Sequence, residues 1–419
     1  MIPNSSLRGC GRAGRVLFAA ALVAGAGVTS APVRAAAETV DEPRLPAVVN
    51  APGTWSDDEG VSGPVAAVGI SPRTRARGIF DHRESLSMFA VSAVDGRATW
   101  LNLPGFSLER WGFVGGVTVS PDGRWLGWVR PSKRSDPGPR DGISGWSVMD
   151  TTTGSIRRLE VDGRDWVRGT WNELAFSGDS HYLLTSYQTP DQPRHATRGH
   201  QFVAWDTFDG TPIVLEEPGH YWLPSLGSAS TDVVWSRKRR VFRTDPTDGS
   251  RTTTVMPRDV LMASWAPADK AFAYIGRNPH NRAADDRLYV GSSPATADRV
   301  VDLPDTSPIG EFLAWRDATH VVLGNYRGEV YVVDITDGEV ETIDLAGYGE
   351  QMNTPVLATA LWQRPFRPAA EPTSTADPRG PWRWASLAIP SAGLLVVLLR
   401  RRKRPKPAAA TDPGPIKSG

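Results

Sequence analysis

The sequence predicts an all-β fold, a β-propeller of six four-stranded blades with seven blades as the alternative, followed by a C-terminal single transmembrane helix. Three observations predict the propeller. One hairpin pattern recurs about every fifty residues, a second hairpin pattern alternates with it, and no strong amphipathic helix interrupts the series. Four-stranded units repeated at this length are typical of propeller blades. Closing such units in a ring hides the sheet edges, which would let the chain hold together without disulfide bonds.

The first hairpin pattern is clearest at residues 117–129, which read VTVSPDGRWLGWV. Asp122-Gly123 between two apolar runs is the strongest short signal of a β-hairpin. The equivalent stretches are 68–80, 174–186, 225–236, 263–275 and 313–325, and the copy at 225–236 is degenerate. Each stretch is expected to form the first two strands of one blade.

The second hairpin pattern is a strand, a turn that ends in glycine, and another strand. It occurs at 89–101, 146–159, 203–215, 242–255 and 331–343, while 288–301 takes the fifth place without the glycine. The turn glycines, which we expect to adopt a positive φ, are Gly96, Gly154, Gly210, Gly249 and Gly338. Four of the turns begin with an aspartate, namely Asp150, Asp206, Asp245 and Asp334. These aspartates could hold calcium, but their recurrence in hairpins favours hydrogen bonds to turn N–H groups.

The two ends of the chain carry targeting patterns. Residues 1–37 contain arginines, an apolar Ala-rich run and small residues, which predicts a secretory signal peptide, with an uncleaved anchor as the alternative. Residues 382–399 are uncharged except for Arg383 and precede five consecutive cations, which predicts a transmembrane helix and a basic cytoplasmic tail over 400–419. We therefore expect an exported, single-pass protein of the cell membrane whose body lies outside.

Between these ends we expect a propeller ectodomain over 44–362 and a Pro-rich stalk over 363–381. Residues 354–362 would form an extra strand that either closes the ring beside 45–50 or begins a partial seventh blade. The only cysteine, Cys10, lies within the signal peptide, so the mature body contains none. An exported body of this kind must be held together by its core alone.

The charge of the expected body is acidic. The chain has 47 basic and 46 acidic residues; residues 1–37 hold four arginines and no acid, and 400–419 hold seven basic residues and one aspartate. The segment between them therefore has a net charge of −9. This balance argues against a general nucleic-acid-binding protein.

Residues 120–126, Ser-Pro-Asp-Gly-Arg-Trp-Leu, resemble the Ser-Pro-Asp-Gly signature of WD-repeat-like blades. Such blades occur in TolB-type periplasmic propellers and in the propeller domains of prolyl-oligopeptidase-like proteins. The resemblance covers about residues 64–348 and is strong in one blade, and the Trp-Asp dipeptide of WD repeats occurs at Trp205-Asp206. The resemblance implies a scaffold for protein contacts and no single activity.

Motifs of known catalytic chemistries are missing from the sequence. It contains no Gly-x-Ser-x-Gly, no His-Glu-x-x-His and no Gly-rich phosphate loop before a helix. We therefore predict no catalytic residue, no metal ligand and no cofactor. A propeller glycosidase with dispersed carboxylates leaves no local motif, so an exported enzyme of the glycosidase or lyase class stays open as the alternative.

Two clusters could hold a ligand. His195 and His200 lie five residues apart, but a metal site needs a third ligand and a fixed frame, so a solvated loop is favoured. The basic run at 237–240 could bind an anion, although a run of one sign is more often a solvated turn.

Three long connections between the second and third strands of blades are expected on one face, at 130–144, 188–201 and 276–287. Their basic residues outnumber their acidic ones, which would steer an anionic partner to this face; surface loops without function are the alternative. The candidate binding residues are Arg134, Arg140, Arg194, His195, Arg198, His200, Arg277, His280 and Arg282.

The sequence therefore predicts a membrane-anchored, extracytoplasmic propeller that acts as a non-catalytic binding scaffold. Its expected partner is a cell-envelope protein or an anionic polymer or glycan, recognised by the long loops. The membrane itself is expected to be contacted by the C-terminal helix, and no nucleic-acid partner is expected.

Overall fold

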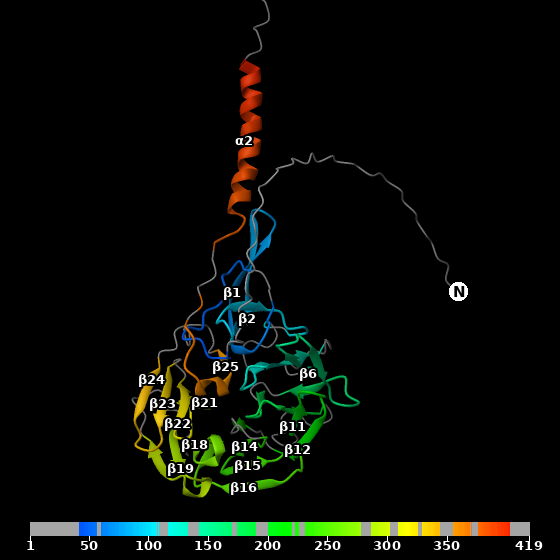
Figure 1. Cartoon of the computed structure of the whole chain (residues 1–419). Coiled ribbons are helices and arrows are strands. Elements are labelled where there is room, and N and C mark those ends of the chain that lie inside the picture. The colour runs from blue at the N-terminus through cyan, green and yellow to red at the C-terminus, as the bar shows by residue number, and fades with distance from the viewer. Residues whose placement is uncertain are drawn as a thin grey trace, which may run out of the picture. The chain divides into compact units, whose positions relative to one another are not determined.

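The computed structural model describes residues 42–56, 60–106, 108, 116–132, 142–169, 174–189, 200–219, 223–225, 231–277, 286–301, 309–325, 329–343, 355–368, 370 and 376–402. Across these residues the chain forms antiparallel sheets and one long helix (Figure 1). The predicted all-β class is therefore confirmed, and the arrangement of the sheets is compatible with a propeller-like fold. The predicted signal peptide at 1–37 lies outside the described residues.

The first sheet combines the two ends of the body. Its strands are, in order, β25 (Val356–Leu357), β1 (Val65–Arg77), β2 (Asp81–Ser92) and β3 (Ala98–Leu101). The predicted turn near Ser71-Pro72 is wrong, because β1 continues through Pro72 and pairs with β2 as far as Arg77. Pro72 is tolerated because β25 pairs only with Ala67 and Val68, so this strand does not need a donor at Pro72.

The next nine strands form one continuous sheet made of two four-stranded units. The second unit contains β4 (Val117–Val119), β5 (Trp125–Pro131), β6 (Gly142–Asp150) and β7 (Ile156–Leu159). The third unit contains β9 (Ala175–Phe176), β10 (Tyr182–Gln188), β11 (His200–Asp206) and β12 (Pro212–Gly219). The short β8 (Val167–Gly169) joins the two units because it pairs with both β6 and β10.

Three further sheets follow in chain order. The fourth contains β13 (Leu223–Ser225), β14 (Val233–Arg237), β15 (Arg240–Thr244) and β16 (Arg251–Val255). The fifth contains β17 (Asp259–Trp265), β18 (Phe272–Arg277), β19 (Arg287–Gly291) and β20 (Arg299–Val301). The sixth contains β21 (Ile309–Trp315), β22 (His320–Asn325), β23 (Val330–Asp334) and β24 (Val340–Ile343).

Buried apolar clusters lie between neighbouring sheets and connect them in a cycle. Separate clusters join the second unit to the third, the third to the fourth, the fourth to the fifth and the fifth to the sixth. The largest cluster joins the first sheet both to the second unit, through Val119 and Trp128, and to the sixth sheet, through Val322 and Val332. Burial of these apolar faces supplies the main favourable term in the folding free energy.

The turn chemistry predicted from the sequence is confirmed. Gly96, Gly154, Gly210, Gly249 and Gly338 all adopt a positive φ. The turn aspartates accept bonds from N–H groups two residues on, as Asp150 does from Thr152 and Asp334 from Thr336. In the fifth sheet, which lacks the glycine, a 3₁₀ turn (Pro294–Thr296) connects β19 to β20.

The C-terminal part of the body completes the first sheet. β25 pairs with β1, and the following 3₁₀ turn η5 (Thr359–Gln363) places Leu361 and Trp362 in the largest buried cluster. Arg367 also pairs with Pro46 in a short parallel bridge, so residues 45–47 lie beside the segment that follows η5. Both chain ends therefore contribute to the first sheet and its surroundings, but β25 pairs with β1 and the bridge to Pro46 comes from Arg367, whereas the predicted closure paired 354–362 with 45–50.

The long helix α2 spans Gly380–Arg402 and contains the segment 382–399 (red in Figure 1). The prediction that this segment crosses a membrane is not supported. Among the helices of the described residues, none is long and apolar enough to span a bilayer.

Candidate functional site

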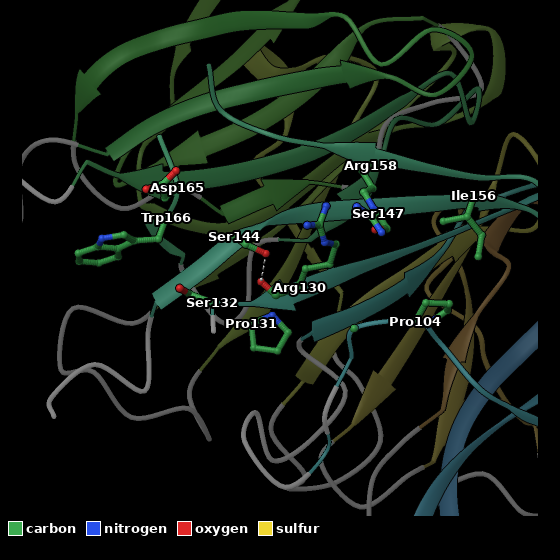
Figure 2. Close-up of a pocket in the computed structure, with 11 residues that line it drawn as sticks. Pro104, Arg130, Pro131, Ser132, Ser144, Ser147, Ile156, Arg158, Asp165 and Trp166 are labelled. Atoms are coloured by element: carbon green, nitrogen blue, oxygen red, sulfur yellow. Dashed lines mark hydrogen bonds between the residues drawn. The ribbon is translucent and has the colours of Figure 1, made fainter. Parts of the chain in front are cut away.

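A groove of about 960 Å³ opens along the second unit (Figure 2). It is lined by Pro104, Gly105, Arg130, Pro131, Ser132, Ser144, Ser147, Ile156, Arg158, Asp165 and Trp166. The residues come from β5, β6 and β7, from the connection that precedes β4, and from the connection that precedes β8. The groove is large enough for a small ligand of several rings.

Strand register explains why one wall of the groove is polar. Trp128 of β5, Ser147 of β6 and Arg158 of β7 are aligned across the second unit, so their side chains share one face. Trp128 is buried against the first sheet, whereas Arg158 at the outer strand is exposed. Along this row, the face therefore changes from a buried apolar side chain at Trp128 to an exposed cation at Arg158.

The opposite wall is held by a hydrogen bond from that core. The indole Nε1 of Trp128 donates to the carbonyl oxygen of Pro104 at 3.1 Å, which fixes the connection after β3. A Cβ added at Gly105 would lie 3.8 Å from the Cγ of Arg130, so the two walls nearly touch at this end. The width of the groove thus depends on contacts between the first sheet and the second unit.

Two arginines line the groove, and their surroundings differ. Arg130 donates to Glu160 at 2.9 Å, so an adjacent carboxylate already partly neutralises its charge. Among the described residues, none makes a hydrogen bond or ion pair with the guanidinium of Arg158. Because Arg158 is exposed and lies over Ser147, its charge is available to an anion entering the groove.

Asp165 and Trp166 lie at one end of the groove, in the connection before β8 (Figure 2). The indole of Trp166 is half-buried and presents a ring face of the kind on which sugar rings pack. Asp165 is exposed and supplies a carboxylate beside that ring. A groove with cations, hydroxyls, an aromatic ring and one carboxylate can bind an acidic carbohydrate and provide a base for its chemistry.

Most of the binding residues predicted from the loops cannot be placed. Seven lie outside the described residues, namely Arg134, Arg140, Arg194, His195, Arg198, His280 and Arg282. His200 begins β11, where burial lowers the pKa of its half-buried imidazole. Arg277 ends β18 in a different sheet, where it is exposed. Their role in binding stays a prediction.

The groove was partly accessible to sequence reasoning. Arg130 begins the first of the long connections, and the groove lies at that end of the second unit. Ser147, Arg158 and Trp166 were missed because no local motif contains them. The basic run at 237–240 spans the turn between β14 and β15, as the interpretation of this run as a turn expects. Arg239 donates there to the backbone carbonyl of Met256.

Metal-ligating side chains do not gather within the described part of the chain. No group of three or more His, Cys, Asp or Glu side chains there is arranged to hold an ion. The turn aspartates instead bind neighbouring side chains, as Asp150 does Arg124 at 2.9 Å and Asp206 does His181 at 2.8 Å.

Comparison with known proteins gives a distant likeness only. No family model matches the sequence, and no curated protein matches it. Two similar solved structures are an oligogalacturonate lyase in complex with manganese and an oligogalacturonate lyase from Vibrio parahaemolyticus. Each is 11% identical with a TM-score of 0.43; the first match covers 67% of this chain and 85% of that chain. The second covers 70% of this chain and 90% of that chain.

Both matched proteins are named as lyases, which is contrary to the predicted non-catalytic binding scaffold. The likeness assigns no residue and no substrate to this chain, and the specific resemblance to TolB-type propellers is not shown by it. The function must be argued from the groove itself.

Proposed function

We propose that the protein is an exported, six-bladed propeller enzyme that cleaves an acidic oligosaccharide in the groove of the second unit. One observation carries the proposal: Arg158, whose guanidinium has no partner among the described residues, lines the same groove as Arg130, Ser147, Asp165 and Trp166. Guanidinium groups match carboxylates in geometry and charge, and an indole ring packs on sugar faces. The signal-peptide pattern at 1–37 supports export.

The groove favours elimination over hydrolysis. Hydrolysis of a glycosidic bond commonly uses two carboxyl groups, one as acid and one as base or nucleophile. Glu160 is paired with Arg130 and does not line the groove, so Asp165 is the one carboxylate among the described residues that line it. A carboxylate base and a cation that line the same groove are the two groups that proton abstraction next to a carboxylate requires.

The proposed step breaks the bond between the sugar carbon and the glycosidic oxygen of a uronate residue. Arg158 pairs with the uronate carboxylate and stabilises the negative charge that develops when the neighbouring carbon loses its proton. Asp165 accepts that proton, the carbon–oxygen bond breaks as a carbon–carbon double bond forms, and water protonates the departing oxygen. The products are a shortened oligosaccharide and an unsaturated uronate.

The test is an assay of the full chain with uronic-acid oligomers, oligogalacturonate included, that follows the ultraviolet absorbance of an unsaturated product. Arg158→Ala should lower kcat/KM by roughly a hundredfold, because it removes charge stabilisation from the transition state. Arg316→Ala is the matched control, since Arg316 is an exposed arginine directly after β21 that pairs with Glu341.

Three results would contradict the proposal. Cleavage without a double bond would show hydrolysis, and equal losses in the Arg158→Ala and Arg316→Ala variants would remove the groove from the reaction. Failure of the chain to bind or cleave any uronate oligomer, measured by calorimetry and by the absorbance assay, would reject the substrate class.

A further inference from the structure

The hairpin of β1 and β2 extends well beyond the rest of the first sheet. The two strands stay paired from Val65 to Arg77, whereas β25 covers only two residues of β1. The side chains at the end of the hairpin are exposed, including the large apolar side chains of Ile79 (45%) and Phe80 (61%). An isolated two-stranded ribbon is marginally stable by itself, so its end needs support from elsewhere.

That support comes from the segment that begins α2, about 300 residues away. Arg379 is only 8% exposed, and its guanidinium lies 4.4 Å from the centre of the Trp55 ring. It donates hydrogen bonds to the carbonyl oxygens of Gly78, at 2.9 Å, and of Asp81. Arg383 donates to the carbonyl oxygen of Ile79 at 2.8 Å.

One carboxylate orients both arginines. Asp377 pairs with Arg379 at 3.0 Å and with Arg383 at 3.0 Å. The hydrogen bond from Arg379 lowers the pKa of Asp377, so the carboxylate is ionised at neutral pH. A buried arginine that satisfies turn carbonyls and is paired with a carboxylate is a specific contact and not a loose surface one. It fixes the end of the hairpin on the first turn of α2.

The two segments joined by this contact carry four large exposed apolar side chains, which we name the tip patch: Ile79, Phe80, Trp382 and Trp384. Trp382 is 69% exposed and Trp384 is 74% exposed. They flank Arg383, which bonds to the hairpin, and successive helix residues point about 100° apart. The two indoles therefore point to different sides of the helix, with Arg383 between them. Farther along the same helix, Leu394 to Leu399 are also exposed and apolar.

We propose that the tip patch inserts into the headgroup region of a phospholipid bilayer that carries anionic lipids. Tryptophan and arginine are the side chains that prefer this depth, while exposed aliphatic and aromatic groups enter the acyl boundary. Basic residues outnumber acidic ones here: Arg75, Arg77, Arg83, Arg379 and Arg383 stand against Asp81, Glu84 and Asp377. The patch combines the end of the β1–β2 hairpin with the start of α2, and its apolar side chains are exposed to a surface that docks there. The proposal concerns contact with the surface of the bilayer.

A single fluorophore can test the insertion, because Cys10 is the only cysteine of the chain. In a Cys10→Ser background, Phe80→Cys carries an environment-sensitive dye at the tip. Val255→Cys is the matched control, since Val255 of β16 is an equally exposed apolar residue at 64%. Vesicles of phosphatidylcholine containing phosphatidylserine should shift the emission of the tip dye to shorter wavelength and leave the control dye unchanged.

Co-sedimentation of the full chain with the same vesicles gives a second readout. Ile79→Ser/Phe80→Ser should lower the partition coefficient roughly tenfold, because two apolar side chains no longer enter the lipid. Val255→Ser/Val300→Ser should leave it unchanged, and circular dichroism verifies that both variants fold. No dye response at Phe80, or a response that depends on protein concentration and not on vesicles, would overturn the proposal; the latter would indicate a contact between protein copies.

Discussion

The second unit is formed from one uninterrupted stretch of chain, from Val117 to Leu159, whereas the first sheet takes its strand β25 from the far end of the body. Both have four antiparallel strands and a turn glycine, Gly154 in one and Gly96 in the other. In the second unit, strand and turn signals follow each other as local hairpins. In the first sheet, the pairing of β25 with β1 joins residues nearly 300 positions apart.

This difference separates local from distant determinants of one architecture. Local hairpins form with little loss of chain entropy, whereas a strand from the other terminus must close a very long loop. Burial of Leu357, Leu361 and Trp362, which β25 and η5 place between the first sheet and its neighbours, offsets this loss of chain entropy. The sheet with the weakest local signals is thus the one on which the cycle depends.

The largest expected effect comes from removing the distant strand. Deleting 355–362 takes out β25 and the buried Leu361 and Trp362, each of which is at most 3% exposed. Replacing one large core side chain by alanine costs about 2–5 kcal/mol, so losing several should abolish the cooperative unfolding transition. Urea denaturation followed by circular dichroism measures this.

The matched control is a deletion of the same length in the tail, at 408–415, which should leave the transition in place. An unchanged midpoint for the 355–362 deletion would mean that the first sheet is stable without its distant strand.

A smaller effect is expected from two glycines of the second unit. Gly123 and Gly154 both have a positive φ, near +78° and +71°. A Cβ at Gly123 would lie 2.4 Å from the carbonyl oxygen of Val65 in the first sheet, whereas a Cβ at Gly154 meets nothing within 4 Å. Gly154→Ala therefore carries only the backbone cost of about 1–2 kcal/mol. Gly123→Ala should cost about 3 kcal/mol or more, because a backbone contact between the sheets must also move.

Denaturant titrations of the two variants measure the difference in their free energies of unfolding. Equal losses would show that the backbone near Val65 can move away from a Cβ at position 123 without lowering the free energy of unfolding.

Sequence reasoning predicted the fold where the signals were local. The run from Ser120 to Gly123 and the five turn glycines lie in the expected hairpins because their backbone conformations depend on the residues themselves. It failed at 68–80, where Ser71-Pro72 resembled the same turn. Pro72 is accommodated in a continuous strand because, in the described part of the chain, no third strand pairs with it, which the short pairing of β25 reveals.

The groove was less predictable than the fold for a similar reason. Arg158 and Ser147 are 11 residues apart in the chain and become neighbours only through the register of β6 and β7. Pro104 joins them from the preceding sheet, held by Trp128. Such a site combines residues from several turns and strands, so no short stretch of sequence contains its pattern.

Trp128→Phe should have an intermediate effect, on both the stability of the contact between the two sheets and the binding of ligand in the groove. Phenylalanine keeps most of the buried ring but loses the hydrogen bond to the carbonyl oxygen of Pro104. We expect a loss of about 1–2 kcal/mol in the free energy of unfolding. We also expect weaker binding of uronate oligomers by calorimetry, because the wall at Pro104 is released.

Trp235→Phe is the comparison, since Trp235 is a buried indole of the fourth sheet. A Trp128→Phe variant that loses stability but binds oligomers with unchanged affinity would separate the groove from this contact.

The smallest expected effect concerns the turn residue that opens each second hairpin. In the second unit this is Asp150, which accepts bonds from Thr152 and Arg124; in the first sheet it is Ser92, whose hydroxyl accepts from Val94. Burial opposes the ionisation of Asp150 most strongly, but the bonds from Thr152 and Arg124 prevail and lower its pKa. Because the folded pKa lies below the unfolded one, ionised Asp150 stabilises the fold above the unfolded pKa of about 4, and this contribution is lost as pH falls through the folded pKa.

Asp150→Asn should therefore cost about 1 kcal/mol at neutral pH and flatten the acid side of the stability profile. Ser92→Ala should cost a similar amount at every pH, since a hydroxyl does not titrate there. Free energies of unfolding measured in urea between about pH 3 and pH 7 distinguish the two, and an unchanged acid slope in Asp150→Asn would place the acid sensitivity elsewhere in the chain.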